Sequence, residues 1–554
     1  MEHIKILQKN HNDLENEGPK SLISRVTGRF YTHEFIGKHL VNSLLSAFIF
    51  NKASSINMID PFCGDGRLIT WLIEGVAESK LWESRPINVT LWDYDEIALW
   101  NAKNNVQQVA QKYRMQVHIN ALNVDTFIFA QHSLGQYHIV VTNPPWEILK
   151  PDQRELKNLN STDTLKYIDG LRQLDERLME LYPISRPRLK FSGWGTNLAR
   201  CGTEVALRIT SPNGICGLVS PASLLADQSS EQLRRWIFSN YTVHDLAYYP
   251  SEARLFDYVD QPSITLVASP DPADEFSPTL TVYNKERKIR SKKVFHFNSN
   301  QLKENGFVIP IQFGSELIEL FTKWRNFPTL GDFEKDNLSG FWVGSELDET
   351  GYQRFLAGEG DFLFLKGRMI KRFGIVEEPT KFVRRDGPRI PVSANYWRLV
   401  WRDVSRPSQK RRLHATLIPP GWVCGNSLNV AYFRNNDLNR LKALLAIFNS
   451  LIFEIQVRAY LSTAHISLGS VRKVRIPPMS NKKLINLLSD LTERCLIGAG
   501  GDGSLADLEV CVAKLYNLSQ DEFKLLLSGF DKLEEEEVSK LLSSTAWHRN
   551  LPKL

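Results

Sequence analysis

The first 150 residues alternate short apolar runs with longer segments whose apolar positions repeat every three or four residues. Short apolar runs occupy residues 56–60, 87–93, 115–125 and 137–143. Between them, the segment 67–78 has apolar side chains at 68, 69, 72, 73 and 76, and the segment 96–113 is a second long periodic stretch. The short runs are typical of buried strands and the longer period of amphipathic helices. This alternation predicts an α/β fold with a doubly wound parallel sheet.

Polar residues follow the first three predicted strands, at the sheet edge where parallel sheets bind ligands. The first strand continues into DPFCGDG (60–66), whose glycines let a ligand approach the backbone closely. Asp93 ends the second strand, where a carboxylate can accept hydrogen bonds from ribose hydroxyls, and Tyr94 can cover an adenine face. Asp125 follows the third strand and can accept from an exocyclic amine. One terminal Asp is usually a turn or capping residue, but three at consecutive strand ends indicate a binding site.

The fourth predicted strand ends in an unusual turn, within the sequence HIVVTNPPWEIL (138–149). Proline cannot continue a sheet ladder, so the strand must stop at Pro144. Each proline also fixes its own φ and restrains the residue before it. The turn therefore holds the amide of Asn143 and the ring of Trp146 in nearly fixed positions at the carboxyl end of a strand.

Charge and composition narrow the class of protein. The net charge is +6, but residues 366–434 alone contain 15 Lys or Arg against 4 Asp or Glu, which favours a polyanion-binding face or a solvated surface. Hydrophobic residues make up 42% and charged residues 23% of the chain, as in soluble globular proteins. The sequence contains neither a signal-peptide core nor an apolar run long enough for a membrane span. The six cysteines show no metal-ligand spacing, so we expect reduced thiols, a cytoplasmic protein and no bound metal.

The order and spacing of these segments resemble the S-adenosylmethionine-dependent amino-methyltransferases that methylate adenine N6 in DNA. Residues 28–40 (GRFYTHEFIGKHL) resemble the opening motif of this family, which usually has Thr-Pro where this chain has Thr32-His33. Residues 213–225 resemble a later strand of the family, and residues 251–269 resemble the hairpin that places an aromatic side chain against the target base. The motif order is that of the gamma arrangement, in which the catalytic domain precedes the target-recognition domain.

The resemblance implies roles for the residues at matching positions. It implies cofactor contacts for Gly28, Phe30, Tyr31, Thr32, Asp60, Phe62, Gly64, Gly66, Asp93, Tyr94, Asp125 and Thr126. It implies a catalytic group of Asn143, Pro144, Pro145, Trp146 and Phe256, with Tyr258 as the second choice for the last position. Adenine N6 is a poor nucleophile, and the Asn143 oxygen and the Pro144 carbonyl would draw its lone pair out of the ring. A flipped-out base would lie between Trp146 and Phe256.

The second half resembles, more loosely, the recognition domain of the same enzymes. Short β-type runs mix there with basic and aromatic residues, and phosphate contacts from Lys and Arg would position a duplex. The candidates are Lys366, Arg368, Lys371, Arg372, Arg384, Arg385, Lys410, Arg411 and Arg412. We expect an N-terminal arm (1–20), a Rossmann-like methyltransferase domain (21–272), an α+β target-recognition domain (273–480) and a helical C-terminal region (481–554).

The sequence is thus interpreted as a site-specific DNA adenine-N6 methyltransferase that uses S-adenosyl-L-methionine and protects host DNA in a restriction-modification or phage-defence system. Its expected partners are double-stranded DNA and, if cleavage accompanies methylation, a separate restriction endonuclease. The stretch 151–200 is interpreted as an insertion, with a lid over the active site as the alternative. Two alternatives remain for the function: a methyltransferase of the same motif acting on RNA or protein, and a non-catalytic DNA-recognition subunit.

Overall fold

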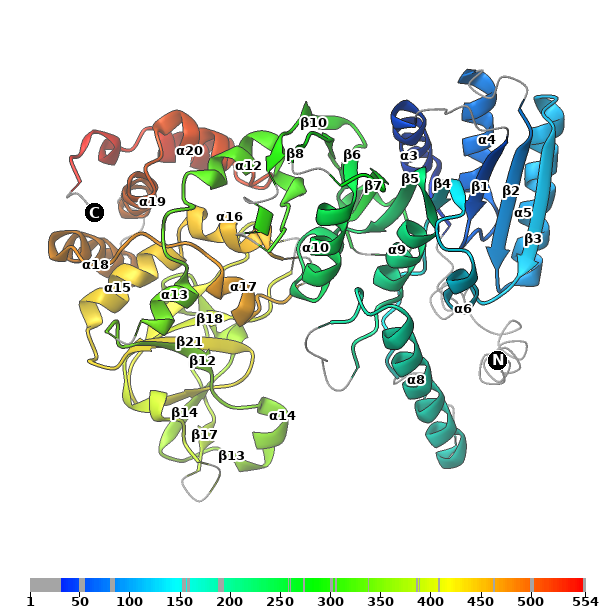
Figure 1. Ribbon diagram of the computed structural model, residues 1–554. Coiled ribbons are helices and arrows are strands. Elements are labelled where there is room, and N and C mark those ends of the chain that lie inside the picture. The colour runs from blue at the N-terminus through cyan, green and yellow to red at the C-terminus, as the bar shows by residue number, and fades with distance from the viewer. Residues whose placement is uncertain are drawn as a thin grey trace. The chain divides into compact units, whose positions relative to one another are not determined.

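The chain forms two compact units, Met1–Ser315 and Glu316–Leu554. The computed structural model, drawn in Figure 1, describes residues 31–48, 55–79, 85–151, 156, 160–187, 194–257, 259, 261–272, 275–298, 302–303, 306–336, 338–384, 387, 389–406, 409–461, 464–498 and 503–551. The site residues Gly28, Phe30, Tyr258 and Arg385, and the predicted arm 1–20, lie outside these ranges.

The first unit is built on a nine-stranded sheet in the order β10-β9-β6-β7-β5-β4-β1-β2-β3. Its strands are β1 (Ile56–Asp60), β2 (Ile87–Asp93), β3 (Val117–Asn123), β4 (Tyr137–Thr142), β5 (Thr210–Pro221), β6 (Thr242–Tyr249), β7 (Ser263–Ser269), β9 (Thr279–Tyr283) and β10 (Ile289–Val294). Strands β1 to β5 are mutually parallel, and β7 is antiparallel to both neighbours, β5 and β6. The predicted parallel sheet and its four strands are therefore confirmed.

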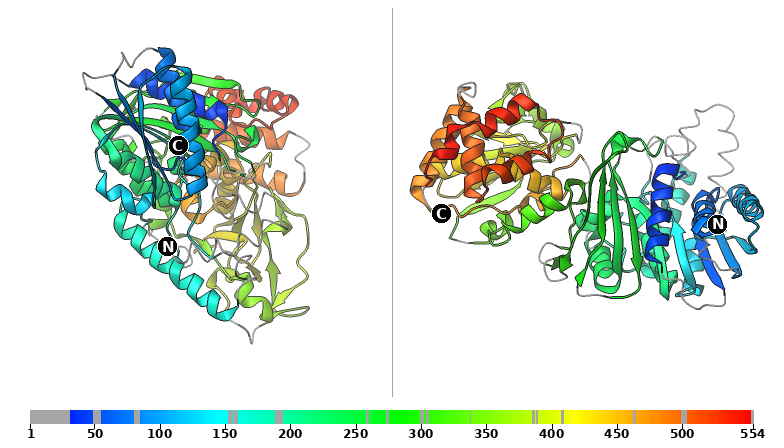
Figure 2. Two further views of the ribbon diagram at one scale, coloured as in Figure 1. Left: turned by 90° about the vertical axis from the view of Figure 1, so that its right-hand side faces the viewer. Right: turned by 90° about the horizontal axis from the view of Figure 1, so that it is seen from above.

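Helices cover both faces of this sheet, as Figure 2 shows in two further views. The helices of this unit are α3 (Glu34–Ala47), α4 (Arg67–Ser79), α5 (Glu96–Lys112), α6 (Thr126–Phe129), α8 (Ser161–Leu181), α9 (Leu198–Ile209) and α10 (Glu231–Asn240), of which α8 projects away from the sheet (Figure 1). The apolar sides of α3, α4 and α5 share one core with Met58 and Val89 of the sheet. Ile59 of β1 and Trp92 of β2 are also fully buried. Helix α9 packs against β4 and β5. Burial on both faces explains why the parallel strands read as continuous apolar runs.

The end of the first unit differs from the predicted boundary between residues 272 and 273. Strand β9 pairs in parallel with β6, and β10 pairs with β9, so the hairpin belongs to the same sheet. The unit continues to Ser315. The predicted boundary is therefore wrong: the hairpin has buried apolar positions, such as Leu280 and Val282, and pairs with β6, a partner that a local pattern does not reveal.

The second unit combines small sheets with helices. Its principal sheets have the orders β12-β21-β18-β19 and β13-β17-β14-β20. The strands are β12 (Phe341–Ser345), β13 (Leu356–Ala357), β14 (Phe362–Leu365), β15 (Ile370–Lys371), β16 (Gly374–Ile375), β17 (Phe382–Val383), β18 (Arg398–Arg402), β19 (Ala415–Ile418), β20 (Trp422–Cys424) and β21 (Leu428–Phe433). The longer helices are α15 (Leu438–Phe448), α16 (Leu451–Ala459), α18 (Lys482–Leu496), α19 (Ser504–Leu515), α20 (Gln520–Leu527) and α21 (Glu535–Leu542). The predicted α+β region with a helical C-terminal part is confirmed.

Two further observations concern the described ranges only. None of the helices there combines the length and apolar character that a bilayer crossing requires. All six cysteines are free and buried.

Candidate active site

Asp60, the last residue of β1, joins the first strand end to the fourth. It is only 1% exposed, and its carboxylate accepts a hydrogen bond from Thr142 Oγ1 at 2.8 Å and another from the Phe62 N–H at 3.2 Å. Burial raises the pKa of Asp60 to about 7, although these two hydrogen bonds act in the opposite direction. Thr142 immediately precedes Asn143, so the DPFCGDG loop and the Asn-Pro-Pro-Trp turn are held together by one short contact.

The loop after β1 is shaped by its two glycines. Gly64 and Gly66 have φ values of +50° and +76°, in the left-handed region that favours glycine. The Gly64 N–H donates to Asp93 Oδ2 at 2.8 Å, which ties the loop to the end of β2. A Cβ on Gly66 would lie 2.8 Å from the Cβ of Ala102, so α5 packs directly against the loop. The second predicted strand-end acid therefore lies beside the first loop, as expected.

The opening segment is held by Arg67, which sequence reasoning did not single out. The Arg67 guanidinium pairs with Asp65, donates to the Thr32 carbonyl at 3.0 Å and lies 4.7 Å from the centre of the Tyr31 ring. Tyr31 is 45% exposed, whereas Thr32 is buried. His33, which replaces the proline of the resembled motif, caps α3 by accepting from the Phe35 N–H at Nδ1.

The turn after β4 brings the predicted catalytic side chains together. Asn143 Nδ2 donates to Thr32 Oγ1 at 3.1 Å, which fixes the orientation of the amide. The rings of Trp146 and Phe256 lie 4.7 Å apart, centre to centre, at an angle of 57°. Both rings are less than a tenth exposed. Trp146 Nε1 is buried and has no hydrogen-bond partner among the residues that the structure describes.

The acid after the third strand, Asp125, caps a helix with its carboxylate. Asp125 is the N-cap of α6, and its Oδ1 accepts from the Phe127 N–H at 3.0 Å. Burial raises the pKa of Asp125 above its usual value. The Thr126 hydroxyl is buried and donates to the Pro61 carbonyl, so its side chain supports the loop. Tyr94, beside Asp93, is 46% exposed.

Gly202 of α9 is a second residue that the sequence analysis missed. A Cβ at this position would lie 2.2 Å from Pro144 Cβ and 3.3 Å from a ring carbon of Phe62. Only glycine therefore lets α9 press against both the Asn-Pro-Pro-Trp turn and the loop after β1. The signal in the sequence was weak, because a glycine inside a helical pattern has several explanations.

Three of the nine basic candidates of the second unit are not available to a ligand. Arg411 pairs with Glu454 at 2.6 Å and with Glu509 at 3.2 Å, and Arg372 also pairs with Glu509. Arg412 is 6% exposed and donates to the Ser405 carbonyl. Burial alone would raise the pKa of Glu454, but Arg411 and Arg458 hold it down to about 2. The prediction that Arg372, Arg411 and Arg412 contact DNA is therefore corrected: the first two pair with buried carboxylates, and Arg412 is itself buried.

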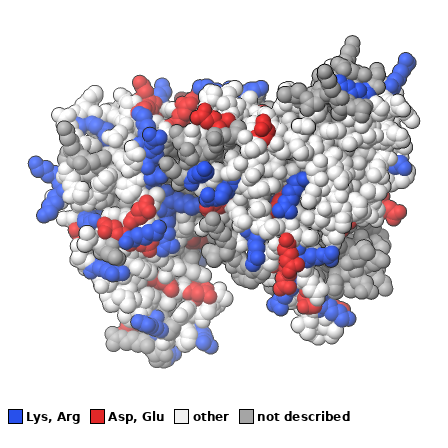
Figure 3. Space-filling view, in the orientation of Figure 1, with Lys and Arg blue, Asp and Glu red and all other residues white. Residues whose placement is uncertain are grey.

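The remaining described candidates lie nearer the surface. Lys371 and Arg384 are exposed. Arg368 has a side chain that is 70% exposed and pairs with Glu377, Lys366 pairs with Glu349, and Lys410 pairs with Glu534 and Glu537. Figure 3 shows acidic side chains next to many of the basic ones on the visible face. Surface pairs of this kind contribute little stability and can exchange their partner for a phosphate.

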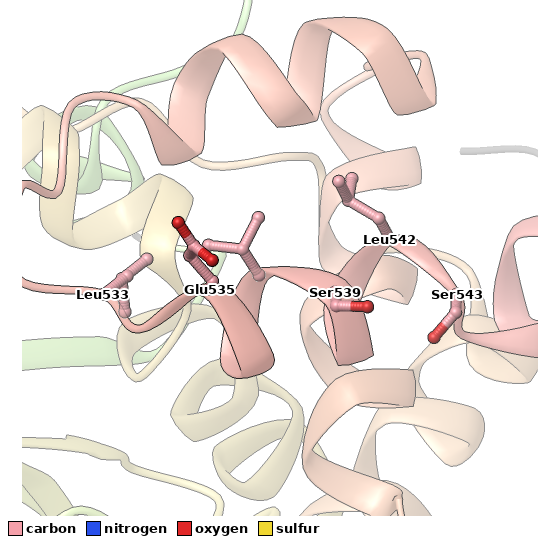
Figure 4. A pocket seen from close by; sticks show the side chains of 6 residues that line it. Leu533, Glu535, Ser539, Leu542 and Ser543 are labelled. Carbon is pink, nitrogen blue, oxygen red and sulfur yellow. The ribbon is translucent and has the colours of Figure 1, made fainter.

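Other features of the described chain are not part of this site. Figure 4 shows a hollow beside α21 that is lined by Leu533, Glu535, Val538, Ser539, Leu542 and Ser543. It belongs to the second unit and contains none of the candidate residues. Within the described ranges, no group of three or more His, Cys, Asp or Glu side chains is arranged to hold a metal ion.

Comparison with known proteins gives a partial sequence match. No family model matches the chain. Over 163 residues, the sequence is 28% identical to the tRNA1(Val) (adenine(37)-N6)-methyltransferase of Serratia proteamaculans (strain 568). This match covers 28% of the chain and 58% of that protein, so the chain spans less than two thirds of the relative's length.

Solved structures of restriction-modification enzymes are similar over most of the chain. The type IIL enzyme MmeI, solved in complex with DNA, has a TM-score of 0.51 at 12% identity and covers 91% of this chain and 74% of its own. The type IIG restriction endonuclease BpuSI has a TM-score of 0.41 at 13% identity, with coverages of 90% and 65%. The chain thus shares the fold of MmeI and is related in sequence, over part of its length, to an adenine-N6 methyltransferase.

Proposed function

We propose that the chain is a DNA adenine-N6 methyltransferase that uses S-adenosyl-L-methionine as its methyl donor. The position of Asn143 carries the proposal. Asn143 follows β4, its amide is fixed by Thr32, and its neighbour Thr142 bonds to Asp60 of the loop after β1. An acceptor for a substrate amine and a loop suited to a cofactor therefore lie side by side at the carboxyl edge of the sheet.

The residues around the loop fit S-adenosylmethionine. The left-handed φ of +50° at Gly64 favours glycine and leaves the backbone without a side chain where a ligand would approach. Asp93 at the end of β2 would accept hydrogen bonds from the ribose hydroxyls, and Tyr31 and Tyr94 are partly exposed aromatic residues that could pack against the adenosyl group. When bound, the cofactor would supply an electrophilic methyl group.

The turn after β4 would activate and hold the substrate. The Asn143 side-chain oxygen and the Pro144 carbonyl would accept from the two N–H groups of adenine N6 and localise its lone pair on nitrogen. Pro144 and Pro145 keep that carbonyl rigid, so little reorganisation is needed in the transition state. Trp146 and Phe256 would hold the base after it leaves the duplex.

Double-stranded DNA is the favoured substrate because the second unit adds exposed basic side chains, among them Arg368, Lys371 and Arg384. They would contact phosphates, while other side chains read the sequence. We further propose that the enzyme acts in the cytoplasm, in restriction-modification or phage defence, with any cleavage made by a separate endonuclease. RNA is the second candidate, because the sequence relative is named for a tRNA substrate.

The test is a transfer assay with tritium-labelled S-adenosylmethionine on duplex DNA, structured RNA and a protein extract, followed by sequencing that detects N6-methyladenine. The proposal expects label in DNA at one recurrent adenine context. Asn143→Ala should abolish the label while keeping cofactor affinity. Label in RNA or protein alone would overturn the DNA assignment, and equal loss of transfer and cofactor affinity in Asn143→Ala would overturn the role of Asn143.

A further inference from the structure

Arg287 lies in the turn between β9 and β10 and reaches two other segments of the first unit. Its Nε donates to the Ala253 carbonyl at 3.2 Å, and its Nη2 lies 3.5 Å from the Arg254 carbonyl. Its Nη1 lies 3.0 Å from Nε2 of His33. One guanidinium therefore contacts both the segment that leads to Phe256 and the residue next to Thr32.

The segment leading to Phe256 needs support from outside. It follows η4 (Ser251–Ala253), a single turn of 3-10 helix, and Arg254 then takes a left-handed φ of +49°. A left-handed conformation in a residue other than glycine is disfavoured and persists only where the surroundings hold it. Arg287 itself has a φ of +63°, and its N–H donates to the Asn284 carbonyl at 3.0 Å, so its side chain extends from a closed turn.

His33 presents no positive charge to Arg287 at neutral pH. Burial and the charge of Arg287 lower the pKa of His33 from its usual value, so the ring is neutral near pH 7. A neutral imidazole has one acceptor nitrogen, so the ring serves either the Phe35 N–H or the guanidinium. When Nδ1 accepts from Phe35, Nε2 carries the proton and cannot accept from Arg287, so the contacts that anchor the guanidinium are those with the Ala253 and Arg254 carbonyls.

The two rings that would hold a base are in contact with each other. The Trp146 and Phe256 rings touch at 4.7 Å, whereas a base between two aromatic faces needs roughly 7 Å between them, twice the stacking distance. Phe256 must therefore move away from Trp146 before a base can enter. Ala253 and Arg254, three and two residues before Phe256, are the nearest positions fixed by Arg287.

We infer that Arg287 is a positioning residue that anchors the start of the Phe256 segment. This anchor lets Phe256 move away from Trp146 when a target base enters and then pack against that base. The inference rests on the proposed function and names a part of the base-holding apparatus that lies outside the resembled motifs. Arg287 touches neither the cofactor loop nor the Asn143 turn in the contacts described above. Its loss should therefore impair base capture and leave cofactor binding intact.

The experiment compares Arg287→Ala with Lys288→Ala, which removes an exposed positive charge from the same turn. Steady-state methylation of the duplex that the unchanged enzyme modifies gives KM and kcat, and calorimetry gives the affinity for S-adenosylmethionine. Arg287→Ala should raise the KM for duplex about tenfold, as a misplaced positioning group does, with cofactor affinity changed less than twofold. Lys288→Ala should change neither. Arg287→Lys, a milder variant, should show the same pattern in smaller measure if Arg287→Ala does not fold.

Hydrogen exchange of the free protein gives a second readout that does not depend on activity. In Arg287→Ala, peptides covering 251–257 should exchange faster, and those of the DPFCGDG loop should not change. An unchanged duplex KM, an equal loss of cofactor affinity or faster exchange throughout the first unit would each overturn the inference. If the unchanged enzyme does not methylate DNA, the proposed function fails instead, and hydrogen exchange still tests the anchor.

Discussion

The hydroxyl of Thr32 is the contact that orients the Asn143 amide. Thr32 was expected to touch the methionine end of the cofactor, and its burial next to Asn143 gives it a second task. Thr32→Val removes the acceptor at almost constant shape, whereas Thr32→Ser keeps it. We expect Thr32→Val to lower kcat about 10-fold to 100-fold through misorientation of Asn143. Thr32→Ser should stay within about threefold of the unchanged enzyme. Single-turnover methyl transfer measures both, and equal rates in the two variants would contradict this role.

Asp60 should make the stability of the protein depend on pH. Its folded-state pKa of about 7 exceeds the ordinary 3.8, so the folded protein binds the proton more tightly than the unfolded chain does. The stabilisation from this proton is complete below about pH 4 and is lost as the pH rises through about 7. When the pH rises from 5 to 8.5, the unfolding free energy of Asp60→Asn should therefore increase by about 2–4 kcal/mol relative to that of the unchanged protein. Denaturant unfolding at both pH values measures the difference, and a pH-independent difference would contradict the assignment.

At the scale of elements, the contact of α9 with the Asn-Pro-Pro-Trp turn sets the position of the Pro144 carbonyl. Gly202→Ala adds a methyl group that would lie 2.2 Å from Pro144 Cβ. We expect kcat to fall at least about tenfold, because the turn must shift, while helix propensity alone would favour alanine by about 1 kcal/mol. Gly358→Ala is the control, since nothing lies within 4 Å of a Cβ there. Activity that survives Gly202→Ala would show that the helix moves instead of the turn.

Arg411 pairs with Glu454 of α16 and Glu509 of α19. Arg411→Leu removes charge-assisted hydrogen bonds to Glu454 and Glu509, which keep Arg458 and Arg372 as partners, so it should cost about 1.5–3 kcal/mol of unfolding free energy. Arg368→Leu, at a side chain that is 70% exposed, should cost less than about 0.5 kcal/mol. For DNA binding we expect the larger effect at Arg368. Arg368→Leu should reduce the slope of log affinity against log salt concentration by about one, whereas folded Arg411→Leu should leave that slope unchanged. Unfolding curves and salt titrations distinguish the two, and a flatter slope in Arg411→Leu alone would contradict the buried-pair reading.

The sequence allowed prediction of those elements whose signal is local. Strands β1 to β4 and helices α4 and α5 each show their own period and were found within a few residues. The β9–β10 hairpin was placed outside the first unit because its partner, β6, is distant in the chain. In the site, the strand-end residues could be found, but the neutralisation of Arg411 could not. Charge density along 366–434 does not reveal where Glu454 and Glu509 fold back.

At the scale of the whole molecule, the chain divides into a unit with the candidate catalytic residues and a unit with the exposed basic candidates. We expect residues 1–315 alone to bind S-adenosylmethionine with about the affinity of the full chain, because every described cofactor candidate lies within them. Duplex methylation by this fragment should fall at least about 100-fold, since the phosphate contacts are lost. Calorimetry and the tritium assay measure the two effects, and full methylation by the fragment would contradict the division of roles.

The place of β7 in the sheet governs when the first unit can be completed during synthesis. β7 is later in the chain than both β5 and β6, yet it lies between them and pairs with each. A nascent chain that ends before Ser263 therefore lacks the strand that joins these two, and their facing edges have no native partner to pair with. Residues 263–269 must emerge from the ribosome and insert into this gap before the two halves of the sheet become continuous. The sheet thus closes late and from its middle, so the period between the synthesis of β5 and that of β7 is the time when the growing chain is most open to wrong strand pairing and to chaperones.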